Sequence, residues 1–377
     1  MIDISIFASL AHFISDFYVS FLTPLGPYFM DKYQITAKQI AFFITAISFI
    51  SSVFQIFFGI IADNVKDRFR FIYLLTATTI FLISLIDFAH SIVTLFILFL
   101  VAYFANSAFH PAGASLSHSV SERGMPIFVS AGTIGAALGP VFVTAFSYFN
   151  LKHLWIIGLP LLALLALFIK PERAKYTRPD KPKEKFHFSK ISTLMDLWIM
   201  VTMRTLIMSV VHLYAPILSV QRGYSLIFGG SLLSIGIAVG VFTTVLGAWI
   251  SKKIGNNLVN FASFLGMSVA LFMLITSSSA FSTILSYTLI DAFGYLTMSS
   301  NVTQAQITLP NHTSFASSFV MGFAWACGTG LRFLLIMPFG DNITIVFYTT
   351  AFISIAMAIF TMTWHRIKSK KQPLRGS

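Results

Sequence analysis

The sequence predicts an all-α polytopic membrane protein with twelve transmembrane helices. Hydrophobic residues make up 56% of the 377 residues and charged residues only 10%, against roughly a quarter charged in a soluble domain. The apolar residues form long unbroken runs, such as 71–85 and 92–104, rather than the alternation of a β-barrel strand. Since a spanning helix needs about 20 apolar residues, the chain has room for about twelve crossings. This composition excludes a soluble globular enzyme, a disordered chain and a fibrous repeat.

The apolar runs divide in chain order into twelve helices separated by polar or basic loops. The longest interruption, Lys170–Lys190, carries eight basic residues and three prolines and is typical of a solvated linker. We expect an N-terminal six-helix bundle over 1–170, a cytoplasmic linker over 171–192, a C-terminal bundle over 193–365 and a basic tail over 366–377. The expected helices cover residues 4–30, 38–62, 70–88, 92–115, 125–149, 153–170, 193–219, 224–249, 257–277, 280–304, 313–338 and 341–365.

The distribution of basic residues predicts the orientation of the chain. With both termini in the cytoplasm, the inner loops and the tail hold 19 of the 25 Lys and Arg residues, the outer loops hold 4, and the helices hold Arg204 and Arg332. This bias follows the positive-inside rule and is not the spread of a nucleic-acid-binding surface. The N-terminus lacks a basic segment and its apolar stretch carries Asp16, so no cleavable signal peptide is expected.

Two weak repeats relate the halves. The segment that begins at Gly59 recurs at Gly247, shifted by 188 residues, and the segment at Ser130 recurs at Phe319, with a similar shift. Two pseudo-symmetric six-helix bundles are typical of transporters in which one half rocks against the other around a site at the membrane midplane.

The loop after the second helix contains a candidate conformational latch. Gly59, Asp63 and Arg68 follow the order glycine, aspartate, then basic residue, and the carboxylate can accept hydrogen bonds from helix N-terminal amides. This pattern resembles the loop signature of the major facilitator superfamily, although Asn64 and Lys66 depart from it and the second copy has Ser251 in place of the aspartate. The alternative is a solvated basic loop that only sets topology.

Helices 1, 4 and 5 carry a narrower resemblance. Helix 5 has a stripe of small residues for close packing, Gly132, Gly135 and Gly139, followed by Pro140. Helix 4 ends in Phe109-His110-Pro111, and helix 1 has His12 followed by Asp16. Together these motifs resemble the fosmidomycin-resistance family of bacterial exporters. The resemblance implies the twelve-helix facilitator fold, a bacterial-type inner membrane and proton-coupled export, but it does not fix the substrate.

Ionisable side chains inside membrane helices are costly and are functional candidates by default. The predicted helices contain seven such residues. Six of them lie on helices 1, 4, 7 and 10, which line the central cavity in the facilitator fold. The seven are His12, Asp16, His110, Arg204, His212, Asp291 and Arg332. At 1.5 Å per residue, Asp16, Arg204 and Asp291 each lie roughly 15–18 Å into the membrane.

The expected roles follow from charge. Asp16 and His12 share one helix face and form the expected proton-coupling site. Asp291 is either a second proton site or the counter-charge of Arg204. Arg204 needs an anion, which is Asp16, Asp291 or an acidic group of the substrate. Further substrate-binding candidates are His110, Asn106, Tyr18, Tyr214 and Asn301.

The chain shows no phosphate-binding loop, no metal-ligand spacing and no hydrolytic triad, so no enzyme activity, cofactor or metal is expected. We expect a monomeric secondary transporter whose partners are protons, a small molecule and the lipid bilayer. Proton-driven efflux of an anionic or zwitterionic compound is the favoured function. Proton-coupled uptake and a non-transporting receptor on the same fold are the alternatives.

Overall fold

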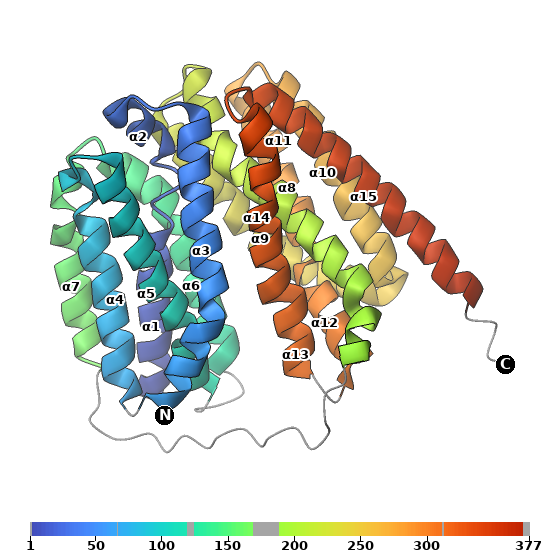
Figure 1. Cartoon of the computed structure of the whole chain (residues 1–377), viewed down its shortest axis with the longest axis horizontal. Coiled ribbons are helices and arrows are strands. Elements are labelled where there is room, and N and C mark those ends of the chain that lie inside the picture. The colour runs from blue at the N-terminus through green and yellow to red at the C-terminus, as the bar shows by residue number, and fades with distance from the viewer. Residues whose placement is uncertain (1, 66, 119–123, 169–187, 311–312, 372–377) are drawn as a thin grey trace. The chain divides into compact units, whose positions relative to one another are not determined.

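The computed structural model is helical throughout the part of the chain that it describes (Figure 1). It describes all residues except 1, 66, 119–123, 169–187, 311–312 and 372–377. Nine of the described helices are long and apolar enough to span a membrane, and two shorter apolar helices, Ile6–Val19 and Leu151–Ala166, add to them. The predicted fold class is therefore confirmed.

The first six predicted helices correspond to seven α-helices. These are α1 (Ile2–Val19), α2 (Gly26–Tyr33), α3 (Ala37–Asn64), α4 (Arg68–Ser84), α5 (Ile92–His118), α6 (Gly124–Phe146) and α7 (Trp155–Ala166). At helix N-termini, side-chain oxygens accept hydrogen bonds from backbone N–H groups that have no acceptor within the helix. Thr36 and Gln39 form a capping box at α3, and Asp67 accepts from the backbone N–H of Arg70 at α4.

The last six predicted helices correspond to eight. These are α8 (Met195–Gln221), α9 (Leu226–Ile254), α10 (Asn256–Thr276), α11 (Ala280–Tyr295), α12 (Met298–Thr308), α13 (Thr313–Ser318), α14 (Ala324–Phe339) and α15 (Ile343–Lys371). One turn of π-helix, Phe319–Phe323, joins α13 to α14. Helices α11 and α12 together make the predicted helix 10.

The prediction of an unbroken helix over 4–30 is wrong. α1 ends at Val19 and α2 begins at Gly26. Pro24 and Pro27 explain the break, because proline has no N–H to donate and clashes with the preceding turn of a helix. Two hydroxyl groups satisfy carbonyls at the end of α1: Ser20 donates to Phe17, and Tyr103 donates to Val19.

The prediction of an unbroken helix over 280–304 is also wrong, since α11 and α12 meet at Leu296 and Thr297. Side chains from three neighbouring helices satisfy the carbonyl groups next to this break. Ser263 Oγ donates to Phe293 O at 2.6 Å, Arg204 Nη1 to Gly294 O at 3.2 Å, and Thr244 Oγ1 to Tyr295 O at 3.2 Å. An interrupted helix is tolerated in a membrane when its freed backbone groups find such partners.

A polar network holds α2 against the loop between α4 and α5. The Asp87 carboxylate accepts from Tyr28 and from Lys32 Nζ, the latter at 2.7 Å. Tyr33 donates to Ala89 O, and burial, with a smaller contribution from Asp87, raises the pKa of its phenol above the usual value. This network fixes the direction of the chain after the break between α1 and α2.

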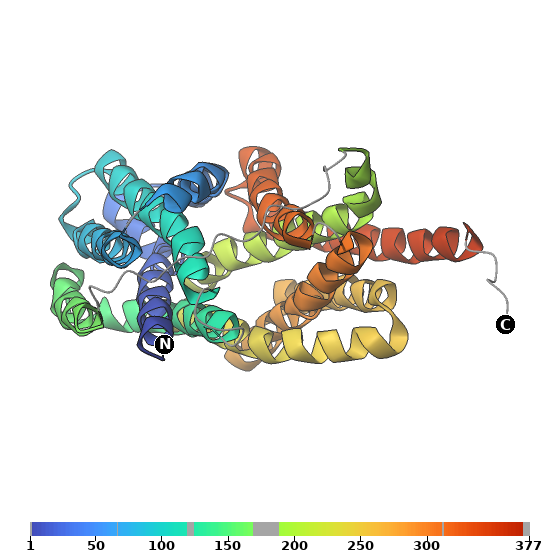
Figure 2. The same cartoon turned by 90° about the horizontal axis from the view of Figure 1, so that it is seen from below.

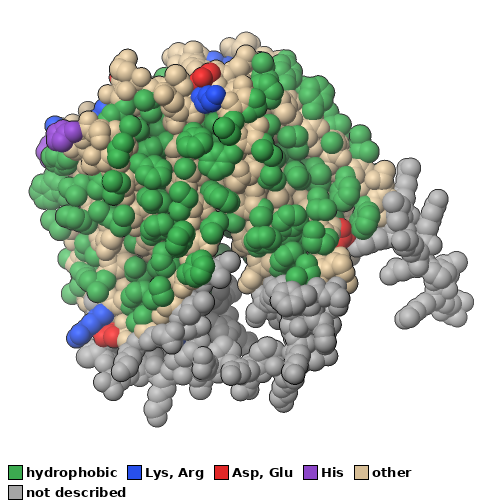
Figure 3. Space-filling view, in the orientation of Figure 1, with side chains coloured by type: hydrophobic (Ala, Val, Ile, Leu, Met, Phe, Trp, Pro, Cys, Tyr) green, Lys and Arg blue, Asp and Glu red, His purple; other side chains and the backbone are tan. Residues whose placement is uncertain are grey.

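The chain divides into two compact units. One contains residues 1–180 and 216–234, and the other contains residues 181–215 and 235–377. The predicted linker lies mostly outside the described residues, so the predicted domain boundaries stay a prediction. On the face shown in Figure 3, hydrophobic side chains cover the middle of the helices and charged side chains gather near their ends. Exposed side chains such as Phe81, Phe242 and Phe352 suit a lipid environment.

Helix α1 lies in the middle of the first unit, packed against α6, α5 and α4 (Figure 1, Figure 2). Its contact with α6 is close because glycines face it. A Cβ atom at Gly135 would overlap the Phe13 carbonyl oxygen, and one at Gly139 would overlap the Ser20 hydroxyl and the Phe17 carbonyl oxygen. The stripe of small residues that ends at Pro140 therefore brings the backbone of α6 against α1.

Candidate functional site

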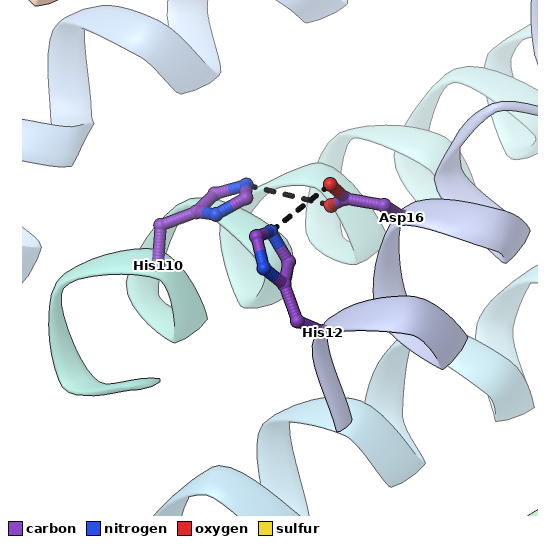
Figure 4. Close-up of side chains that lie close together, drawn as sticks. All are labelled: His12, Asp16 and His110. Carbon is purple, nitrogen blue, oxygen red and sulfur yellow. Dashed lines mark ion pairs between the residues drawn. The ribbon is translucent and has the colours of Figure 1, made fainter. Parts of the chain in front are cut away.

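Asp16 is held between two imidazole rings in the first unit. Its Oδ2 atom lies 3.1 Å from His12 Nε2, one helical turn earlier on α1, and its Oδ1 atom lies 3.6 Å from His110 Nε2 on α5. Both rings point toward the carboxylate (Figure 4). The side chains of His12 and Asp16 are 7% and 20% exposed, so the carboxylate keeps limited access to solvent.

Helix α6 fixes the position of His12. The imidazole stacks on the Phe128 ring at a centroid distance of 4.0 Å, and its Nδ1 lies 2.7 Å from the Phe128 carbonyl oxygen. A Cβ atom at Gly132 would overlap the imidazole. Glycine at 132 is therefore what allows the ring to lie flat between α1 and α6.

The hydrogen bonds around His12 determine how many protons the pair holds. A carbonyl oxygen only accepts, so Nδ1 carries a hydrogen and donates it to Phe128. In a neutral imidazole the other nitrogen, Nε2, then has a lone pair, which would face the Asp16 carboxylate at 3.1 Å. Two acceptors at this distance repel unless a proton lies between them. One proton added to a neutral imidazole and a carboxylate would turn the His12–Asp16 contact into a hydrogen bond.

The second imidazole is oriented by a short polar chain. Ser15 Oγ donates to Asn106 Oδ1 at 2.7 Å, so the amide nitrogen of Asn106 points to His110 Nε2, at 3.3 Å. His110 Nε2 then accepts and needs no additional proton in this arrangement. Both Ser15 and Asn106 are buried.

The same three side chains have a spacing that a metal ion can use. One ligand atom from each of His12, Asp16 and His110 lies within 4.8 Å of the others. Two imidazoles and a carboxylate suit a transition-metal ion.

The second unit contains another carboxylate–imidazole pair. Asp291 on α11 is fully buried, and its Oδ1 atom accepts from His212 Nε2 on α8 at 2.7 Å. Its Oδ2 atom lies against Gly236 of α9, where a Cβ atom would overlap it. Of the two alternatives for Asp291, the structure does not show the ion pair with Arg204: that guanidinium bonds to Gly294 instead.

Arg204 is a buried cation with few partners. Its side chain is 4% exposed, its Nη1 atom donates to the Gly294 carbonyl, and its Nε atom has no hydrogen-bond partner among the residues that the structure describes. No carboxylate of the described part of the chain forms an ion pair with it. A buried guanidinium in this state has unused donors for an anionic group.

The other predicted binding residues take part in buried contacts. The Tyr18 hydroxyl donates to Leu154 O, and the Tyr214 hydroxyl donates to Gly340 O. Asn301 exchanges hydrogen bonds with Asn260 and accepts one from Asn256. None of these contacts tests a role in substrate binding.

The predicted latch is only partly visible. Gly59 and Asp63 belong to α3, but the placement of the Asp63 side chain is not described; Arg68 is the first residue of α4. The sequence did not point to Ser15 or Phe128, which complete the cluster around Asp16. Ser15 directly precedes Asp16 and was a possible signal, whereas a backbone carbonyl on another helix leaves none.

Comparison with known proteins decides the family. The profile of the Major Facilitator Superfamily matches residues 8–334. The chain belongs to the major facilitator superfamily. Membership makes it a multi-pass membrane transporter. No curated protein sequence matches the chain.

Solved structures of the superfamily share the fold at low sequence identity. A POT family transporter in complex with a thioalcohol-conjugated peptide is 14% identical with a TM-score of 0.77, covering 96% of this chain and 95% of that one. A bacterial homologue of the human lysosomal transporter Spinster is 14% identical with a TM-score of 0.74, covering 99% and 98%. A D-xylose–proton symporter is 13% identical with a TM-score of 0.67, covering 96% and 97%.

The packing of the His12 imidazole against Gly132 can be tested by a double-mutant cycle. Gly132→Ala should destabilise the protein by about 1–3 kcal/mol, because the new methyl group pushes the imidazole from its place. His12→Ala in the same chain should recover most of that loss, since it removes the overlapping ring. Thermal unfolding of the purified variants measures both effects.

Gly135→Ala is the matched control for this cycle. Its methyl group meets the backbone of Phe13 rather than the imidazole, so His12→Ala should not rescue it. If His12→Ala restored the stability of both glycine variants equally, the His12 imidazole would not pack specifically against Gly132.

Proposed function

We propose that the protein is a proton-coupled exporter that exchanges incoming protons for a small anionic or zwitterionic organic compound. It would lie in a bacterial-type inner membrane as a monomer with both termini in the cytoplasm. The observation that supports coupling most directly is the buried contact between His12 Nε2 and Asp16 Oδ2, at 3.1 Å. A membrane-embedded pair whose hydrogen bonds demand a proton in one state can release it in another.

Proton movement is coupled to transport if the hydration of the His12–Asp16 pair differs between the conformational states of the cycle. While the pair is poorly hydrated, the bare Asp16 carboxylate is costly and the proton is retained. When the site opens to the cytoplasm, water and a bound substrate change that balance and the proton leaves. Binding of substrate and binding of the proton then exclude each other, which is the requirement for exchange.

Arg204 supports the proposed substrate class. Its guanidinium is buried, it bonds only one backbone carbonyl, and no described carboxylate pairs with it. A carboxylate, phosphonate or phosphate of the substrate can accept two parallel hydrogen bonds from such a group. The resemblance to the fosmidomycin-resistance family makes a phosphonate such as fosmidomycin the first compound to test.

The remaining predicted residues have supporting roles in this proposal. His110 and Asn106 hold Asp16 in place, Tyr18, Tyr214 and Asn301 stay proposed substrate-binding residues, and Gly59, Asp63 and Arg68 form the latch. The glycine stripe of α6 keeps α1 rigid while the site opens and closes.

Asp16→Asn should abolish proton-driven transport, because an amide does not titrate. The protein is reconstituted in liposomes loaded with labelled phosphonate, in a buffer with a chelator to remove metals. Acidifying the external bath should accelerate efflux through the wild type and raise the outside-to-inside phosphonate ratio at equilibrium by at least about tenfold per pH unit; it should leave efflux through the variant unchanged. Asp31→Asn, which replaces an exposed carboxylate, is the control and should behave as the wild type.

Other results of this experiment separate the alternatives. Slower efflux in the acid bath would indicate proton-coupled uptake instead of export. Undiminished proton-driven efflux through Asp16→Asn would remove Asp16 from the coupling mechanism. If a wide panel of anions gives neither flux nor thermal stabilisation, a receptor without transport becomes the better explanation.

Arg204→Met should weaken binding of an anionic compound by about tenfold or more, because the buried donors are lost. Arg204→Lys should recover only part of the affinity, since an ammonium group cannot form the two parallel bonds of a guanidinium. Calorimetric binding of the same phosphonate to the purified variants measures the change. Equal affinity in all three proteins would contradict a role of Arg204 in anion recognition.

A further inference from the structure

We propose that the protein binds two exchangeable protons, one at the His12–Asp16 pair and one at the His212–Asp291 pair, and that both move in each transport cycle. This inference rests on the proposed function and adds its stoichiometry and the second site. The argument for the second proton differs from the argument for the first.

Asp291 is more deeply buried than Asp16. Its side chain is 0% exposed, against 20% for Asp16, and it lies inside a helix of the membrane-spanning region. Its hydrogen bond from His212 at 2.7 Å needs only the ordinary hydrogen of a neutral imidazole. With that single hydrogen the pair carries a full negative charge.

The charged and titratable groups around Asp291 do not balance this charge. Tyr287 and Tyr295 lie on its own helix, and α8 contributes His212 and Arg204. The neighbouring α10, Asn256–Thr276, has no titratable side chain, and α9 presents Gly236 to the carboxylate. Among the residues that the structure describes, no Lys or Arg forms an ion pair with Asp291.

An uncompensated carboxylate in this position is expensive. Removing one charge of a buried pair costs several kcal/mol in proteins, and the cost is no smaller in a membrane. One additional proton, on either His212 or Asp291, makes the pair neutral overall. The His212 side chain is 24% exposed, whereas that of Asp291 is 0% exposed, so His212 is the more accessible member of the pair.

A carboxylate–imidazole contact between helices occurs in each unit. Asp16 on α1 contacts an imidazole on α5, and Asp291 on α11 contacts an imidazole on α8. In terms of the predicted helices, each unit joins its first and fourth helix through a carboxylate–imidazole contact. Each pair also rests on a glycine of a third helix, Gly132 for His12 and Gly236 for Asp291. Because each site is complete within its own unit, each can hold a proton independently.

Two protons change what the transporter can achieve. At zero membrane potential and a pH difference of one unit, one exchanged proton supports a concentration ratio of about tenfold, and two support about a hundredfold. A two-proton exporter can therefore clear its substrate against a much steeper gradient.

The number of protons can be counted without a known substrate. Purified protein in detergent with a chelator is shifted from mildly acidic to mildly alkaline pH, and an indicator dye measures the protons released per molecule. Asp16→Asn and Asp291→Asn should each release one proton fewer than the wild type, and the double variant two fewer. The control Asp31→Asn should match the wild type, because this exposed carboxylate belongs to neither pair.

The outcomes separate this inference from the proposed function. If Asp16→Asn loses one proton and Asp291→Asn loses none, the second site is wrong while proton coupling at Asp16 stands. If neither variant loses a proton, both proposals fail. Should Asp291→Asn not fold, the wild type labelled with ¹³C-aspartate serves instead: two carboxyl resonances should shift over this range, and a single shifting resonance would overturn the inference.

Discussion

The burial of the Asp16 carboxylate against His12 is the interaction on which the first unit depends. A charge inside the membrane is tolerated only with partners, and those of Asp16 are His12 on α1 and His110 on α5; His12 is in turn bonded to the Phe128 carbonyl on α6. The close approach of α6 is possible because Gly132 leaves room for the imidazole and Gly135 for the α1 backbone. The glycine stripe and the charged cluster are therefore parts of one arrangement.

The second unit meets the same constraint with different residues. His212 supports Asp291, and Arg204 supports the backbone at the junction of α11 and α12. Ser263 and Thr244 satisfy the neighbouring carbonyls, so the helix can be interrupted close to the buried carboxylate. A break beside an ionisable group places a flexible point where protonation changes the local charge, and this suits a transporter that changes shape during its cycle.

Hydrophobic runs and loop charges were sufficient to predict the fold, because the bilayer limits a chain of this composition to helices. The same reasoning found every ionisable residue of both pairs, since such residues stand out in apolar helices. It did not determine partners. Asp291 pairs with His212 rather than Arg204, and nothing local to residues 204, 212 and 291 records which of them meet. The break after Val19 had a signal in Pro24 and Pro27, whereas the break at Leu296 has no proline and depends on tertiary contacts.

The most direct test of this account is the protonation state of His12 in the membrane. Solid-state NMR of protein with ¹⁵N-labelled histidine in liposomes, assigned by comparison with His12→Gln, reports on both ring nitrogens. The account predicts a hydrogen on Nδ1, bonded to the Phe128 carbonyl, and a second hydrogen between Nε2 and the Asp16 carboxylate at neutral pH. A neutral ring with its only hydrogen on Nε2, beside an ionised Asp16, would contradict it.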